Sequence, residues 1–110
     1  MLNTVHPPLK FVTYLNKTGD GGTIVLNNFD GQVTYKKNEI IMIEVSSALR
    51  RKGYGTLLLQ NAENNIKKNG WTYVMLTSIS AESDQFYLKN GYRRCSIFSI
   101  LWRRQYIKYF

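Results

Sequence analysis

The chain of 110 residues contains a single cysteine, Cys95, and so cannot form an internal disulfide framework. This scarcity is typical of proteins in a reducing compartment, and we expect the cytoplasm or the nucleus. No stretch approaches the roughly 20 apolar residues that cross a bilayer, and the first ten residues lack the apolar core of a signal peptide. The sequence therefore predicts a soluble protein with no membrane partner.

Acidic residues are also scarce, since 7 Asp and Glu stand against 15 Lys and Arg, which gives a formal net charge of +8. Such a balance favours anionic partners, either a nucleic acid, an acidic protein surface or a polyphosphate cofactor. Proline occurs only at Pro7 and Pro8, and the sequence has no repeat, low-complexity tract or linker. We expect one domain over residues 1–110.

Apolar periodicity and turn signals predict the order β-β-β-β-α-β-α-β-β, an α+β fold of six to seven strands with two main helices. The expected strands are Leu9–Asn16, Thr23–Asn28, Gly31–Asn38, Glu39–Ser47 and Trp71–Ser78, followed by two within Tyr92–Phe110. The first helix is expected over Gly53–Asn69, with Gly70 as its C-terminal cap. The second is expected around Asp84–Asn90, capped by Ser80 or Ser83 and ended by Gly91.

The segment Arg50–Thr56 stands where a strand leads into the first helix. The first backbone N–H groups of a helix bind anions, and glycine lets a ligand approach the backbone closely. Gly53 and Gly55 supply that access, and Arg50, Arg51 and Lys52 add positive charge. The spacing matches neither a Walker loop nor the Gly-x-Gly-x-x-Gly dinucleotide fingerprint. An anion site and a tight turn with close helix packing both remain open on these residues alone.

Two motifs then resemble one family. Arg50-x-x-Gly53-x-Gly55 resembles the acyl-CoA pyrophosphate motif of the GNAT superfamily of N-acetyltransferases, and Phe86-Tyr87 with Gly91-Tyr92 resembles its Phe-Tyr-x-x-x-Gly-Phe/Tyr element. The resemblance covers residues 39–92. The sequence from Glu39 to Thr56 is most similar to the histone-acetyltransferase branch, whereas the Phe86-Tyr87 order favours the general family. The usual two helices after the first strand have no room in this sequence.

The resemblance implies a GNAT-like mixed, mostly antiparallel sheet and direct transfer of an acetyl group from acetyl-CoA to a primary amine in a ternary complex, without a metal. Backbone groups around Ile43 and Val45 would hold the pantetheine arm. The pyrophosphate would lie on the segment Arg50, Arg51, Lys52, Gly53, Tyr54, Gly55 and Thr56. Ser80 stands where the family commonly has an asparagine and is expected to hydrogen-bond the cofactor arm.

The resemblance also suggests catalytic groups. Glu39 matches the glutamate that acts as general base in the histone-acetyltransferase branch, and Tyr87 matches the tyrosine that protonates the departing thiolate. Glu44 is a further carboxylate of the same strand, and strict alternation along a strand would turn it to the opposite face from Glu39. A solvent-exposed carboxylate and an aromatic on an apolar helix face are the alternatives that the residues leave open.

Other readings remain. The arginines and aromatic residues near the C-terminus have the composition of a nucleic-acid-binding surface, and a fold that binds acyl-CoA without turnover is the second alternative. The absent helices leave the acceptor site either open to a large substrate or completed by a second subunit, through an exposed edge of the strand in Arg103–Phe110. Small amines, protein lysines and protein N-termini are all candidate acceptors.

Overall fold

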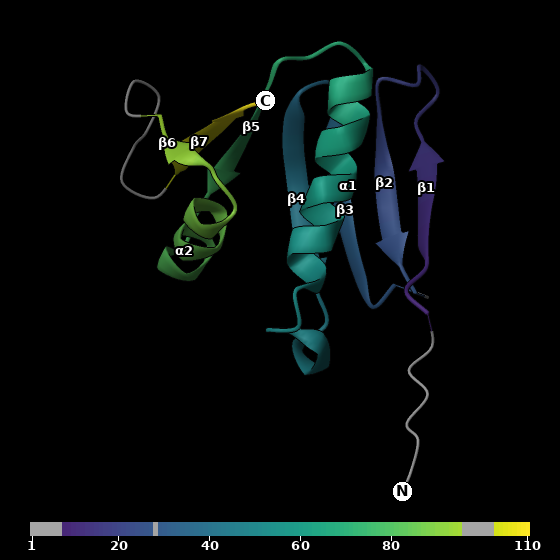
Figure 1. Cartoon of the computed structure of the whole chain (residues 1–110), viewed down its shortest axis with the longest axis horizontal. Coiled ribbons are helices and arrows are strands. Elements are labelled where there is room, and N and C mark those ends of the chain that lie inside the picture. Colours follow the sequence, from purple (N-terminus) through teal and green to yellow (C-terminus); the bar gives the residue numbers. More distant parts are fainter. Residues whose placement is uncertain (1–7, 28, 96–102) are drawn as a thin grey trace, which may run out of the picture.

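The computed structural model describes residues 8–27, 29–95 and 103–110, which form one seven-stranded sheet and two α-helices (Figure 1). The elements in chain order are β1 (Phe11–Leu15), β2 (Gly21–Leu26), β3 (Gly31–Lys36), β4 (Glu39–Val45), a 3-10 turn (Ser47–Leu49), α1 (Tyr54–Lys68), β5 (Tyr73–Ser78), α2 (Ala81–Lys89), β6 (Arg93–Arg94) and β7 (Arg104–Tyr109). This order confirms the one predicted from the sequence. The turn between the last two strands lies largely outside the described residues.

The sheet has the order β1-β2-β3-β4-β5-β7-β6 and is antiparallel except between β4 and β5. These two strands run parallel and pair only at Glu39 with Met75 and at Ile40 with Leu76. After Ile40 they diverge, because no further pair joins them. The mixed, mostly antiparallel sheet is therefore as predicted, and it opens at its centre (Figure 1).

A β-bulge interrupts β4 at the same place. Thr34 of β3 pairs with Met42, and the next residue, Tyr35, pairs with Ile40, so Ile41 has no partner in β3. An extra residue in one strand bends it and increases its twist. The bulge also shifts the alternation of side chains along β4 by one position.

That shift corrects the expectation that Glu39 and Glu44 face opposite sides. Glu39 lies opposite Lys36 and Glu44 lies opposite Gln32. Lys36 and Gln32 are separated by four positions of one strand, and directly opposed residues share a face. Both carboxylates therefore lie on the same face of the sheet, because the bulge adds one residue between them.

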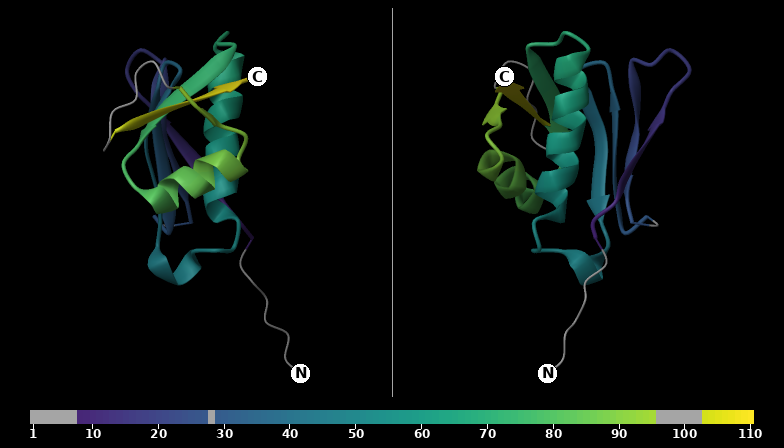
Figure 2. Two further views of the ribbon diagram at one scale, coloured as in Figure 1. Left: turned by 90° about the vertical axis from the view of Figure 1, so that its left-hand side faces the viewer. Right: turned by 45° about the vertical axis from the view of Figure 1, so that its right-hand side comes forward.

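The core lies on the other face, under α1. The helix buries its apolar stripe Leu58, Leu59, Ala62 and Ile66 against side chains of the sheet, among them Ile24 and Val33. Figure 2 shows α1 running along this face. Tyr87 of α2 and Tyr106 of β7 belong to the same buried cluster, so both helices lie on one side of the sheet.

The far face is uncovered in the described part of the chain. Tyr14, Thr23, Thr34 and Met42 form a row across β1–β4, in which the Thr23 and Thr34 hydroxyls lie 3.0 Å apart. Tyr14 and Met42 are exposed. The chain between β1 and β2 forms only a turn. This agrees with the expectation that the sequence has no room for two helices after the first strand.

The C-terminal strand occupies an interior position. β7 pairs with β5 along all of Arg104–Tyr109 and with β6 at Tyr106 and Ile107. β5 covers one side of the strand, and β6 covers the other side only at Tyr106 and Ile107. The edge expected to be exposed is thus paired in the middle of the strand, and its use by a second subunit stays a prediction. Among the described residues, neither helix is long and apolar enough to cross a membrane.

Candidate functional site

A cleft of about 1100 Å³ lies where β4 and β5 diverge. Its walls are the end of β4, the loop and first turn of α1, and one side of α2. Figure 1 shows how these elements are arranged. The lining residues are Ile43, Glu44, Val45, Leu49, Arg50, Arg51, Gly53, Tyr54, Gly55, Thr56, Glu82, Ser83, Gln85, Phe86, Tyr87, Leu88 and Lys89. Most of the residues singled out in the sequence therefore meet in one cleft.

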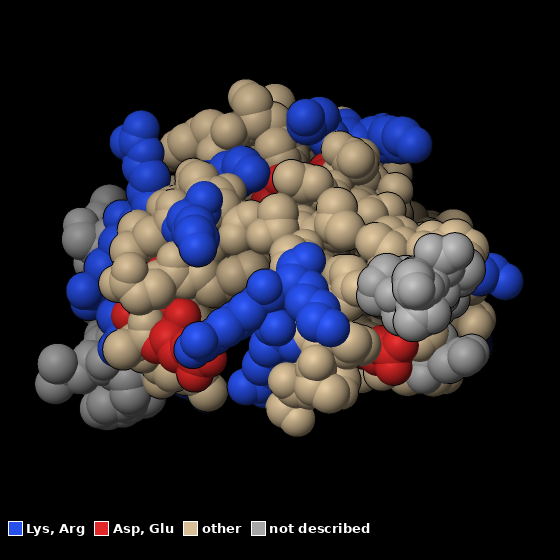
Figure 3. Space-filling model, turned by 60° about the horizontal axis from the view of Figure 1, so that its bottom comes forward, with Lys and Arg blue, Asp and Glu red and all other residues tan. Residues whose placement is uncertain are grey.

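The first turn of α1 opens onto this cleft without a side-chain cap. Gly53 is the N-cap residue, and no side chain hydrogen-bonds to the backbone there. An uncapped helix start leaves backbone N–H groups available to a ligand, at the positive end of the helix dipole. Arg50 and Arg51 line the same end of the cleft, and Lys and Arg side chains gather near the middle of this end of the molecule (Figure 3). The arrangement suits an anion.

The two glycines of this loop serve different purposes. Gly53 has φ of 82°, a left-handed conformation that disfavours other residues, and a Cβ there would have no atom within 4 Å. A Cβ on Gly55 would lie 3.1 Å from Cζ of Phe86 in α2. Gly53 thus leaves the anion end of the cleft open, whereas Gly55 lets α1 approach α2 closely. The close packing that was one alternative for the loop is present at Gly55, and the anion site at Gly53 stays a prediction.

The end of β4 forms a second wall. Ile43 and Val45 line the cleft on the face that packs toward α1, and β5 provides no pairing partner beyond Ile40. The backbone of β4 is therefore available along its β5 side to an extended ligand. Arg50 Nε donates to the carbonyl of Val45 at 3.3 Å, which fixes that guanidinium beside the strand end.

The two carboxylates differ in position. Glu44 lines the cleft and accepts a hydrogen bond from Nε2 of Gln32. Glu39 is exposed at the other end of β4 and is not among the lining residues. Both lie on the face away from α1, and Glu44 is the nearer of the two to the anion end.

Tyr87 lies in the α2 wall and is 8% exposed. Its ring packs against those of Tyr92 and Tyr106, with centroids 5.9 and 6.2 Å away. Burial raises the pKa of the Tyr87 phenol above its usual value. The phenol therefore stays protonated at neutral pH, as a proton donor must.

Ser80 is the N-cap residue of α2. Its Oγ accepts from the backbone N–H of Ser83 at 3.0 Å and caps α2, as one of the two predicted capping serines. Ser80 does not line the cleft, whereas Ser83 does. Ser83 precedes Tyr87 by four residues, about one helical turn, so the two side chains lie on the same face of α2. This spacing could have identified Ser83 as a lining residue from the sequence.

Further lining residues were not identified from the sequence. Glu82, Gln85, Leu88 and Lys89 share the α2 wall with Tyr87, and Leu49 ends the 3-10 turn. These residues lie next to the recognised motifs in the sequence but are not part of them. Their place in the cleft therefore becomes visible only in the folded structure. Within the described ranges, no group of three or more His, Cys, Asp or Glu side chains could hold a metal ion.

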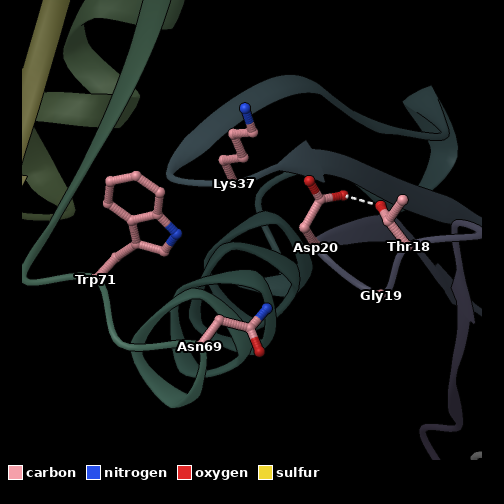
Figure 4. Close-up of a pocket in the computed structure, with 6 residues that line it drawn as sticks. All are labelled: Thr18, Gly19, Asp20, Lys37, Asn69 and Trp71. Atoms are coloured by element: carbon pink, nitrogen blue, oxygen red, sulfur yellow. Dashed lines mark hydrogen bonds between the residues drawn. The ribbon is translucent and has the colours of Figure 1, made fainter.

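A second, shallower hollow of about 370 Å³ lies at the other end of α1. Figure 4 shows its residues, which come from the β1–β2 turn, the β3–β4 turn and the chain after α1: Thr18, Gly19, Asp20, Lys37, Asn69 and Trp71. The Thr18 hydroxyl donates to Asp20 at 2.6 Å. α1 separates this hollow from the cleft by its length of 15 residues, about 22 Å.

The fold and cleft together define a class: an α+β protein whose sheet opens between two parallel strands, beside an uncapped helix N-terminus and flanking arginines. The family model of the acetyltransferase (GNAT) domain matches residues 10–94. The chain belongs to this family. No curated protein sequence matches it.

Solved structures of the family share the fold. The PaiA N-acetyltransferase from Thermoplasma acidophilum, in complex with coenzyme A, is 21% identical with a TM-score of 0.74, over 83% of this chain and 62% of that one. A candidate streptothricin acetyltransferase from Bacillus anthracis, in complex with acetyl coenzyme A, is 20% identical with a TM-score of 0.74, over 83% and 63%. A Bacillus subtilis acetyltransferase in complex with coenzyme A is 16% identical with a TM-score of 0.73, over 94% and 99%. The chain thus spans less than two thirds of the first two proteins and nearly all of the third.

Proposed function

We propose that the chain is an acetyl-CoA-dependent N-acetyltransferase, which transfers the acetyl group directly to a primary amine in a ternary complex. The observation that carries the proposal is the uncapped first turn of α1, which opens with Arg50 and Arg51 into the cleft between the diverging β4 and β5. Membership in the GNAT family and the cofactors bound to three family structures support it.

The cleft provides places for the parts of this cofactor. The pyrophosphate would lie on the backbone of Gly53–Thr56, with the two arginines beside it. The pantetheine arm would pair with the backbone of β4 at Ile43 and Val45, where β5 has turned away. No side chain caps the helix start, so these N–H groups are the donors that an anion needs.

Bound acetyl-CoA supplies an activated thioester: the amine nitrogen forms a bond to its carbonyl carbon, the carbon–sulfur bond breaks, and the thiolate leaves. An amine with a pKa of about 10.4 is neutral in only roughly one molecule in a few thousand at pH 7, so a base must take up its proton. Glu44 lines the cleft and Glu39 is the glutamate of the family resemblance, and either would accept this proton from the uncovered face of the sheet. Tyr87 would donate its proton or a hydrogen bond to the leaving sulfur.

Isothermal titration with acetyl-CoA tests the cofactor site. A carboxylate in the first turn of a helix favours the helix by roughly 0.3–1 kcal/mol, so Thr56→Glu should fold normally while repelling the pyrophosphate. We expect micromolar binding by the wild type and binding weakened at least about 10-fold in Thr56→Glu, because the added charge lies where Thr56 lines the cleft. Thr56→Gln has the same size without the charge and should bind within about threefold of the wild type. Failure of the wild type to bind would refute the proposal.

Release of free thiol from acetyl-CoA, measured against a panel of small amines, lysine peptides and free peptide N-termini, tests the reaction. Tyr87→Phe should lower kcat by about 10² to 10⁴, the usual contribution of a general acid, at unchanged cofactor affinity. Glu44→Gln and Glu39→Gln are compared side by side, and the variant that loses the acidic limb of the pH profile identifies the base. Tight binding without turnover of any amine would instead identify an acyl-CoA-binding module.

A further inference from the structure

Glu63 is a buried charge that the proposed reaction does not use. It lies in the middle of α1 and is 6% exposed. Its Oε2 accepts a hydrogen bond of 2.7 Å from the Tyr92 hydroxyl, and its Oε1 forms an ion pair of 3.0 Å with Nζ of Lys108. The same Nζ lies 5.6 Å from the centre of the Tyr92 ring. A buried carboxylate is costly unless it is paired and hydrogen-bonded, and here both oxygens are.

These three residues connect α1 to the β5 side of the sheet. Glu63 belongs to α1, which packs on the β2–β4 part of the sheet. Tyr92 follows the end of α2, and Lys108 lies in β7, both on the β5 side. β4 and β5 are paired at only two positions, so the contacts that α1 makes with the β5 side help to hold the two parts of the sheet together. Lys108 lies opposite Val74, before the β4–β5 pairs and away from the end at which the cleft opens.

Tyr87 lies next to this bridge. The Tyr92 ring packs edge-on against the Tyr87 ring at 5.9 Å, and the backbone N–H of Tyr92 donates to the Tyr87 carbonyl at 3.0 Å. At the start of α2, Asp84 forms an ion pair of 2.7 Å with Arg104 of β7. The segment that carries Tyr87 is thus anchored on both sides, and on the Tyr92 side the anchor is Glu63.

We propose that Glu63 is a positioning residue: its hydrogen bond to Tyr92 holds the Tyr92 ring, which holds the Tyr87 phenol toward the leaving group. The effect on the rate rests on the proposed function, whereas the effect on the Tyr87 ring does not. A hydrogen bond fixes the direction of the Tyr92 ring, which apolar packing alone does not do. Loss of this bond should therefore alter kcat more than the binding of acetyl-CoA.

The direct variant is Tyr92→Phe, which removes one hydroxyl and keeps the ring beside Tyr87. We expect kcat to fall about 5- to 20-fold, with the KM for acetyl-CoA within twofold of the wild type. Glu63→Gln is the conservative variant, because its amide oxygen still accepts from Tyr92, and it should keep kcat within threefold. Glu63→Leu has no acceptor and should match or exceed the loss in Tyr92→Phe. Ile66→Val, on the same helix and fully buried, is the control for mild destabilisation and should leave kcat unchanged.

A second readout needs no substrate. In protein labelled at the tyrosine ζ-carbon, the NMR resonance of Tyr87, assigned with Tyr87→Phe, should shift or broaden in Tyr92→Phe and Glu63→Leu. It should stay in place in Glu63→Gln and Ile66→Val. An unmoved Tyr87 resonance in Tyr92→Phe overturns the inference, and so does a loss of kcat that Ile66→Val reproduces. Absence of turnover in the wild type would refute the proposed function, while the resonance would still decide whether Glu63 positions Tyr87.

Discussion

Gly31 allows the first half of α1 to approach β3, and replacing it tests how tightly the helix is seated. Gly31 is buried at the start of β3, opposite Val45, the last residue of β4. A Cβ there would lie 2.9 Å from Cδ1 of Leu58 and 3.3 Å from the carbonyl oxygen of Glu44. Leu58 is fully buried, so its side chain cannot move out into solvent. Gly31→Ala should therefore displace α1 or strain Leu58.

The magnitude follows from two opposing terms. Alanine restricts the unfolded chain more than glycine does, which favours the folded state by about 0.4–1 kcal/mol. One extra methyl group in a packed core costs about 1–3 kcal/mol. We expect Gly31→Ala to lower the free energy of unfolding by about 1–2 kcal/mol net. Leu58→Ala alone should cost about 2–5 kcal/mol.

Urea unfolding of the two single variants and the double variant measures the coupling. With Leu58 shortened, the alanine at position 31 fills space that Cδ1 had occupied, so the double variant should be more stable than the sum of the single losses by about 1–3 kcal/mol. Additive losses, or a Gly31→Ala protein as stable as the wild type, would show that α1 is not seated against this glycine.

Two further predictions concern α2 and the chain after it. Burial, and for Tyr92 also the hydrogen bond to Glu63, raises the pKa values of Tyr87 and Tyr92 above 10. Because the unfolded chain releases these protons at lower pH than the folded protein, the two tyrosines should leave the unfolding free energy constant below pH 10 and lower it above pH 10. Urea midpoints between pH 8 and 11 measure this fall, which should be less steep in Tyr92→Phe. Ser80→Ala removes the hydrogen bond to the Ser83 N–H and should cost about 0.5–2 kcal/mol in thermal or urea unfolding, whereas Ser80→Asp, which still accepts it, should cost less.

The order of the elements could be predicted because its signals are local. The apolar stripe of α1, the glycine after it and the serine cap of α2 each lie within a few residues of the boundary that they mark. The loop of Arg50–Thr56 and the pair Phe86-Tyr87 were recognisable for the same reason. Their meeting in one cleft follows once β4 and β5 are placed side by side.

The rest depends on contacts between distant residues. Tyr92 and Lys108 are 29 and 45 positions from Glu63, and no spacing in the sequence joins them. The interior position of β7 follows from its pairing with β5 on one side and β6 on the other, which the composition of Arg103–Phe110 does not indicate. Glu39 and Glu44 share a face because one residue between them, Ile41, is unpaired. Its apolar side chain does not distinguish it from the other residues of the strand, so the sequence does not indicate the bulge.

Ile41 also stands where the sheet opens. The last pair between β4 and β5 is Ile40 with Leu76, and the bulge in the β3–β4 pairing begins at the next residue. A bulge bends its strand. We therefore attribute the divergence of β4 from β5 to Ile41, the extra residue of β4 in its pairing with β3. Ile41 itself is 55% exposed, and its side chain is therefore not needed to fill the core.

Deletion of Ile41 tests this attribution. Every β3–β4 pair on either side of the bulge stays in register when the unpaired residue is removed, so the protein should fold. β4 would lose its bend, pairing with β5 would extend past Ile40, and the cleft would narrow. We expect acetyl-CoA binding to be lost while the free energy of unfolding is kept, measured by titration and urea unfolding on the same sample. Substitution of Ile41 by Thr keeps the extra residue and should preserve binding, and a deletion variant that still bound the cofactor would assign the opening to another cause.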